Sequence, residues 1–186
     1  KNTFYSYTYF SILLLNTVIV SLLMKPDLIN ERAQIKKNVK KDDIFYALII
    51  GRVGPFLMVI TCGADARFGW TDPLSISIKI TALVIMIAGL LLSDWAVIIN
   101  IFFSGVVRIQ RERGHRVIDK GPYKIVRHPG YSGSIVYSLA TPLVLNSLAG
   151  FVPVILLIGI TVIRTKKEDV YLKEELEGYK EYSEKI

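Results

Sequence analysis

The chain has 186 residues, 52% of them hydrophobic, and a formal net charge of +7. This length predicts a single domain. The apolar residues form long runs with the charges between them, which excludes an ordinary soluble globular protein and predicts a multi-pass membrane protein. Cys62, the only cysteine, excludes an intrachain disulfide.

The first three apolar runs are residues 4–24, 44–63 and 74–107. The first has no signal-peptide cleavage pattern, so we expect it to be a membrane span. The third would form a helix about 50 Å long at about 1.5 Å per residue, which exceeds a hydrocarbon core of about 30 Å. We therefore expect this helix to project past the membrane, with Asp94, Asn100 and Ser104 marking its exit from lipid.

The last two runs, residues 131–145 and 148–163, are short and are separated by Asn146-Ser147. Two short runs around such a break favour a tight helical hairpin over two independent helices. The sequence therefore predicts an all-α integral membrane protein of one domain, residues 1–186, with five transmembrane helices. The last two helices form the hairpin.

Positive charge predicts the orientation of these spans. Loop 25–43 has six Lys/Arg, loop 108–130 has seven and the tail from residue 164 has six, whereas loop 64–73 has one. With five spans, the three basic segments fall on one side, which the positive-inside rule assigns to the cytoplasm. The N-terminus is then expected outside, and segments 108–130 and 164–182 are expected in the cytoplasm.

Loop 108–130 contains both histidines and reads RIQRERGHRVIDKGPYKIVRHPG. Its basic residues alone fit attraction to anionic lipid, but its repeated Gly and Pro predict a shaped turn system. In the tail, Arg164 and Glu168 share a helical face, which fits either a snorkelling arginine with a surface ion pair or a functional site. The hairpin would bring the two segments together at the boundary between water and lipid.

The segment GHRVIDKGPYKIVRHPGYSG, the hairpin and RTKKEDVYLKEELEGYKEY together resemble the isoprenylcysteine carboxyl methyltransferase family of membrane enzymes. The resemblance covers residues 108–182. It implies methyl transfer from S-adenosylmethionine to the carboxylate of a C-terminal prenylated cysteine, giving a methyl ester and S-adenosylhomocysteine. The implied partners are a lipid-modified cysteine, or another lipid-like substrate, and the bilayer.

The same resemblance implies residue roles. Arg164 would bind the substrate, and Arg164 and Glu168 would be the two catalytic residues. The residues expected to bind the cofactor are Gln110, His115, Arg116, Val117, Ile118, Tyr123, His128, Pro129, Gly130, Tyr131 and Glu168. His128 would either form a hydrogen bond with the cofactor or only stabilise the turn.

The chemistry is compatible with these roles. A carboxylate is already a nucleophile at neutral pH, so positioning supplies much of the rate and no general base is needed. Arg164 could orient the carboxylate through a bidentate contact. Two histidines separated by twelve residues, without a cysteine pair, do not predict a metal site. The basic loops face a membrane, which disfavours nucleic-acid binding.

Three alternatives remain open from the sequence. One is methylation of another membrane lipid, such as a phospholipid amine, and another is a membrane sterol-type reductase that uses NADPH. The third is a scaffold or transporter, which the clustering of polar residues at one interface disfavours. Arg52 and Asp94, which lie inside apolar runs, are expected either to neutralise each other or to contribute to a substrate cavity.

Overall fold

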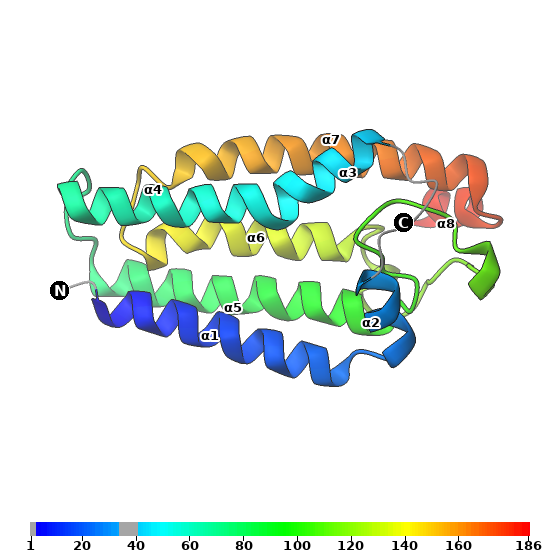
Figure 1. The fold of residues 1–186 in the computed structure, drawn as a ribbon, viewed down its shortest axis with the longest axis horizontal. Helices are drawn as coiled ribbons and strands as arrows, with labels where there is room; N and C mark the ends of the chain where they lie inside the picture. Colours follow the sequence, from blue (N-terminus) through cyan, green and yellow to red (C-terminus); the bar gives the residue numbers. More distant parts are fainter. Residues whose placement is uncertain (1–2, 34–40) are drawn as a thin grey trace.

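The computed structural model describes residues 3–33 and 41–186, and these residues form helices and loops without a strand. Five long helical segments lie roughly parallel and alternate in direction (Figure 1). They are α1 (Thr3–Leu23), the continuous segment formed by α3 (Lys41–Leu48), a π-helical turn (Ile49–Val53) and α4 (Gly54–Phe68), then α5 (Ile76–Ile99), α6 (Pro129–Val144) and α7 (Phe151–Glu175).

The shorter elements gather at one end of the bundle (Figure 1). They are α2 (Pro26–Ala33), two 3₁₀ turns (Arg111–Arg113 and Gly121–Lys124) and α8 (Tyr179–Lys185). We call this the basic end, defined by residues 24–33, 100–128 and 164–186. The opposite far end consists of residues 68–75 and 145–150.

Within residues 3–33 and 41–186, three helical segments are long and apolar enough to cross a membrane: Phe4–Leu23, Asp42–Phe68 and Ile76–Ile99. Large apolar side chains on these segments are exposed, among them Leu22 at 79% and Ile76 at 65%. A soluble protein rarely exposes apolar surface so extensively, whereas lipid accommodates it. The fold is therefore that of an all-helical membrane protein.

The second segment is one continuous helix because a π turn absorbs its irregular residues. Pro55 cannot donate a backbone hydrogen bond, so regular helical pairing cannot pass through it. The N–H of Gly54 instead reaches the carbonyl of Ile49, five residues back. This turn carries Arg52, whose side chain is exposed. Helix α4 ends at Gly69, which takes the left-handed conformation at φ 68°.

Helix α5 ends at Ile99, so the prediction of one helix through residue 107 is wrong. The reason is local hydrogen bonding at Asn100. Its side-chain oxygen accepts from the N–H of Phe102 at 2.9 Å, which stabilises a turn in competition with the helix. The apolar residues that follow therefore enter the basic end as a loop.

Helices α5 and α6 approach each other most closely at Gly89 and Gly133. A Cβ atom on Gly133 would lie 2.6 Å from the carbonyl oxygen of Gly89, and one on Gly89 would lie 2.6 Å from the backbone nitrogen of Tyr137. Small residues at a crossing let helix backbones pack directly in membranes. The α5–α6 pair therefore fixes the direction in which α6 begins at the basic end.

The predicted alternative of an Arg52–Asp94 pair is wrong. Asp94 accepts from Asn16 of α1 at 3.4 Å, Arg52 is exposed, and no ion pair joins the two among the described residues. Asp94 instead helps attach α1 to α5, next to a core that contains Tyr9, hydrogen-bonded to Tyr137 at 2.7 Å.

Candidate functional site

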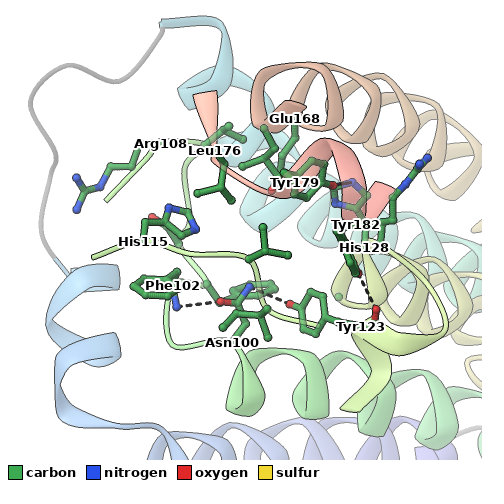
Figure 2. A pocket seen from close by; sticks show the side chains of 18 of the residues that line it. Asn100, Phe102, Arg108, His115, Tyr123, His128, Glu168, Leu176, Tyr179 and Tyr182 are labelled. Atoms are coloured by element: carbon green, nitrogen blue, oxygen red, sulfur yellow. Dashed lines mark hydrogen bonds between the residues drawn. The ribbon is translucent and has the colours of Figure 1, made fainter. Parts of the chain in front are cut away.

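A cavity at the basic end is enclosed by loop 100–128, the first turn of α6, the charged half of α7 and α8 (Figure 2). Its volume is about 100 Å³, and it opens to solvent at its mouth. The lining mixes aromatic, apolar and charged side chains. These side chains suit a partly polar ligand.

His115 forms one wall of the cavity, with its ring 4.5 Å from that of Phe102. Burial, together with the charges of Arg108 and Arg113, lowers the pKa of His115 from 6.5 to about 4, so the imidazole is neutral at physiological pH. Its Nδ1 accepts from the backbone N–H of Gln110 at 3.2 Å. The proton must then reside on Nε2, which makes this nitrogen a hydrogen-bond donor for a ligand.

His128 stands on the wall opposite His115 (Figure 2). It belongs to a network centred on Asp169. Asp169 Oδ1 lies 3.3 Å from His128 Nε2 and 3.0 Å from the hydroxyl of Tyr179, while Lys173 pairs with Oδ2 at 2.8 Å. Burial opposes the charge of Asp169, but these hydrogen bonds prevail and lower its pKa. The carboxylate thus holds two cavity side chains in place.

The first turn of α6 explains the residues after His128. His128 is the N-cap of α6, and Pro129 occupies the first helical position, where its missing N–H costs nothing. Gly130 lies inside the helix, where a Cβ would come within 2.8 Å of the ring of Phe103. Gly130 therefore provides space for this ring. Tyr131 donates to Glu168 Oε2 at 2.7 Å.

Arg164 is buried at the edge of the cavity, with 6% of its surface exposed. Its Nε donates to Asp43 Oδ1 at 2.9 Å, and its Nη2 donates to Asp43 Oδ2 at 3.2 Å and to the carbonyl of Gly105 at 2.9 Å. The guanidinium also lies 5.8 Å from the centre of the Tyr131 ring. Arg164 is therefore already paired with a carboxylate that the sequence analysis did not identify.

Helix α8 closes the cavity from the C-terminal side. The chain turns at Gly178, whose φ of 79° strongly favours glycine, and Tyr179 and Tyr182 then pack on Leu176. Tyr182 donates to the carbonyl of Tyr123 at 2.6 Å, while Arg127 donates to the carbonyl of Ser183 at 3.0 Å. Burial raises the pKa of Tyr182 to about 12, so this hydroxyl remains a donor at physiological pH.

The structure brings most of the predicted site residues to this one cavity. Those that line it are His115, Arg116, Val117, Ile118, Tyr123, His128, Gly130, Tyr131, Arg164 and Glu168. Two predicted cofactor contacts, Gln110 and Pro129, are buried behind the wall and do not line it. Gln110 instead donates to the carbonyl of Phe102 at 2.7 Å and accepts from Arg113, which stabilises the fold of the loop.

Several residues with a part in the site were missed from the sequence. Asp169 directly follows Glu168, which was a usable signal, because adjacent acidic residues lie on different faces of a helix and can serve different partners. Asp43 and Glu31 gave no signal, since their partners lie far along the chain: Glu31 binds Arg108 at 2.8 Å and 2.9 Å. Ion pairs of this kind depend on the tertiary fold.

The chemical features of the cavity suit a ligand with both a polar head and an aromatic or apolar part. Neutral His115 offers an N–H donor and Glu168 offers a carboxylate. No group of three or more His, Cys, Asp or Glu side chains in the described residues is arranged to hold a metal ion. Arg164 is the buried cation nearest to Glu168 along the chain and could face an anionic group.

Comparison with known proteins adds independent evidence. The model of the isoprenylcysteine carboxyl methyltransferase (ICMT) family matches residues 77–174, somewhat more than half of the chain. Protein-S-isoprenylcysteine O-methyltransferase B of Arabidopsis thaliana is 30% identical over 86 residues, which is 45% of this chain and 44% of that protein. A probable protein-S-isoprenylcysteine O-methyltransferase of Oryza sativa subsp. indica is 33% identical over 86 residues, 45% of each chain. The matches thus span less than half the length of these curated relatives.

Proposed function

The chain belongs to the isoprenylcysteine carboxyl methyltransferase family, and from that premise we propose that it methylates the carboxylate of a C-terminal prenylated cysteine with S-adenosylmethionine as methyl donor. The observation that carries the proposal is the single cavity to which both family segments contribute. His115 comes from the loop segment, and Glu168 comes from the tail segment.

The residues present fit the proposed cofactor. The extended segment 115–118 and the rings of Tyr123 and Tyr179 line the cavity and can contact an adenosine group. The Nε2 donor of His115 can bind a purine nitrogen or a ribose oxygen. Glu168 Oε2 accepts from Tyr131, while no hydrogen bond among the described residues uses Oε1, so that this oxygen is available to an ammonium or hydroxyl group. The acidic side chain also favours a cationic ligand.

When bound, S-adenosylmethionine would supply an electrophilic methyl group, which the acceptor carboxylate oxygen would take up as the carbon–sulfur bond breaks and leaves its electron pair on sulfur. No proton moves, so the protein needs no general base. The residues contribute by aligning the two reactants and excluding water, which supplies much of the rate of such a displacement.

In this mechanism, Arg164 orients the acceptor carboxylate and Glu168 holds the cofactor. Arg164 approaches the acceptor with Nη1, because Nε and Nη2 are used by Asp43 and Gly105. The acceptor carboxylate therefore meets only one edge of Arg164, whose charge Asp43 already neutralises. The sequence had instead suggested a bidentate contact with an unpaired arginine. Because this contact with Arg164 is weak, the acceptor carboxylate stays nucleophilic.

We further propose that α6 and α7 complete a five-span topology as a tight hairpin, with the N-terminus outside and the cavity on the cytoplasmic side. The support is the distribution of Lys/Arg, which are dense in the loops of the basic end and sparse at the far end. A prenylated acceptor would then reach the site from the bilayer. A single accessible cysteine introduced at each end, labelled from either side of the membrane, tests this orientation.

Ligand binding by the purified protein tests the cofactor. We expect S-adenosylhomocysteine to bind and NADPH not to bind. The reverse result would reject the methyltransferase proposal in favour of a reductase.

Methyl transfer to S-farnesylcysteine tests the acceptor, and a phospholipid amine serves as the competing substrate. We expect Glu168→Ala to weaken S-adenosylhomocysteine binding and Arg164→Ala to raise the KM for S-farnesylcysteine. Full activity of both variants would reject these role assignments, and preferential methylation of the phospholipid amine would reject the substrate.

A further inference from the structure

Asp43 lies outside the region matched by the family, yet its carboxylate is bound to the proposed acceptor-binding arginine. It stands in the first turn of α3, and only 8% of its surface is exposed. Its partner Arg164 is 121 residues away in α7. The two side chains form part of the wall between the cavity described above and a second cavity between α3 and α7, which Asp43 lines.

Three N–H donors converge on the two oxygens of Asp43. Oδ1 accepts from Arg164 Nε at 2.9 Å, while Oδ2 accepts from Arg164 Nη2 at 3.2 Å and from the backbone N–H of Val107 at 2.6 Å. An ionised carboxylate suits this arrangement because it only accepts, whereas the amide of an asparagine would turn an N–H toward one of the donors. The position therefore requires a carboxylate.

The remaining contacts fix the rest of the guanidinium. Nη2 also donates to Gly105, and the Tyr131 ring lies against one side of the group. None of the hydrogen bonds formed among the described residues uses Nη1, and Arg164 lines the cavity that contains His115 and Glu168. The arginine is thus held on three sides and presents one edge.

We propose that Asp43 is a positioning residue for the acceptor: it holds Arg164 so that Nη1 alone meets the carboxylate to be methylated. The inference rests on the proposed function, because it needs Arg164 to contact the acceptor. An arginine held in this way binds a carboxylate at a fixed distance and angle. A small displacement at a reacting centre is sufficient to cost about 10²-fold in rate.

The test compares Asp43→Asn with two matched controls in the full-length protein. Asp42→Asn removes the neighbouring carboxylate of α3, whose side chain is 79% exposed and lies 3.8 Å from Lys167. Glu31→Gln removes the other buried carboxylate that binds the 104–108 segment, through Ser104 and Arg108, without touching Arg164. The readouts are KM for S-farnesylcysteine, the inhibition constant of its neutral methyl ester and S-adenosylhomocysteine binding.

We expect Asp43→Asn to raise the KM for the carboxylate at least about tenfold through misplacement of Arg164. Affinity for the methyl ester should stay unchanged, because the ester lacks the charge that Nη1 contacts. Asp42→Asn should match the wild type. Glu31→Gln should change the affinity for S-adenosylhomocysteine more than it changes the KM for the acceptor. A general loosening of the loop would instead make Glu31→Gln and Asp43→Asn alike.

Arg164→Lys provides a second test in case Asp43→Asn does not fold. Lysine keeps the charge and one bond to Asp43 but has no separate edge for the acceptor, so the KM for S-farnesylcysteine should rise. A wild-type KM in this variant, or in a folded Asp43→Asn protein, would overturn the role of Asp43 but not the proposed function. A wild-type protein that binds S-adenosylhomocysteine but methylates no prenylated cysteine would overturn the proposed function and this inference with it.

Discussion

Replacing Gly133 with alanine tests whether the α5–α6 crossing fixes the site. The added Cβ would lie 2.6 Å from the carbonyl oxygen of Gly89, 2.6 Å from the backbone nitrogen of Ser93 and 3.0 Å from the Ser93 Cα. These are backbone atoms on a packed helix, so no rotamer change relieves the contact. The helices must separate by about 0.8 Å to restore ordinary contact.

The expected cost follows from that separation. Overpacking of a well-packed contact costs about 1–3 kcal/mol, and alanine returns about 1 kcal/mol through its higher helix propensity. The net loss of up to about 2 kcal/mol lowers Tm by up to about 8 °C in a protein of this size. Since α6 begins at Pro129, the shift also moves His128 and Tyr131, and S-adenosylhomocysteine binding should weaken.

Gly159→Ala is the matched control, because a Cβ at Gly159 of α7 meets no atom within 4 Å. The same substitution there should leave ligand binding unchanged and raise Tm by about 1–4 °C, from a gain of about 0.5–1 kcal/mol in helix stability. Thermal unfolding of both variants in the same detergent gives the comparison. A Gly133→Ala protein as stable as Gly159→Ala would refute the reasoning.

Three further predictions concern single side chains. The pKa of His115 is near 6.5 in the unfolded chain and about 4 in the folded protein. Acidification through this interval should therefore lower the free energy of unfolding, by up to about 3 kcal/mol. His115→Asn should flatten this pH dependence, as measured by denaturant titrations. Asp169→Asn should weaken S-adenosylhomocysteine binding about tenfold, or about 1.4 kcal/mol, by releasing His128 and Tyr179, and calorimetry showing unchanged affinity would contradict this. Asp65→Asn should cost about 1–3 kcal/mol of stability, because Ser147 and the N–H of Ala149 converge on Oδ2 at the far end, yet leave ligand affinity intact.

The sequence predicted most clearly what depends on local pattern. The apolar runs predicted helices, and the Gly and Pro residues of loop 108–130 predicted a shaped loop. The family motifs predicted most of the side chains that share the cavity, all but Gln110 and Pro129. Glu168 and Tyr131, 37 residues apart, are in direct contact.

The end of α5 and the partners of the arginines could not be predicted in the same way. The residues after Ile99 are apolar and continue a helical pattern, so only the side-chain bond of Asn100 reveals the break. Arg164 and Asp43 are also 121 residues apart, and no periodicity connects them. Electrostatic partners are decided by the packing of α3 against α7, which single-sequence patterns do not encode.

These partners mean that the region matched by the family does not form the site alone. Glu31 and Asp43 lie before residue 77, and Tyr179 and Tyr182 lie after residue 174. Without Asp43, Arg164 would lose the carboxylate that compensates its charge, and an uncompensated buried charge costs about 3–5 kcal/mol. Without Glu31, Arg108 would keep only its more exposed partner Glu112. Without the tyrosines, Asp169 and the carbonyl of Tyr123 would lose donors. The family motifs supply most of the groups that line the cavity, while the flanking segments of this chain supply the charges and hydroxyls that hold those groups in place.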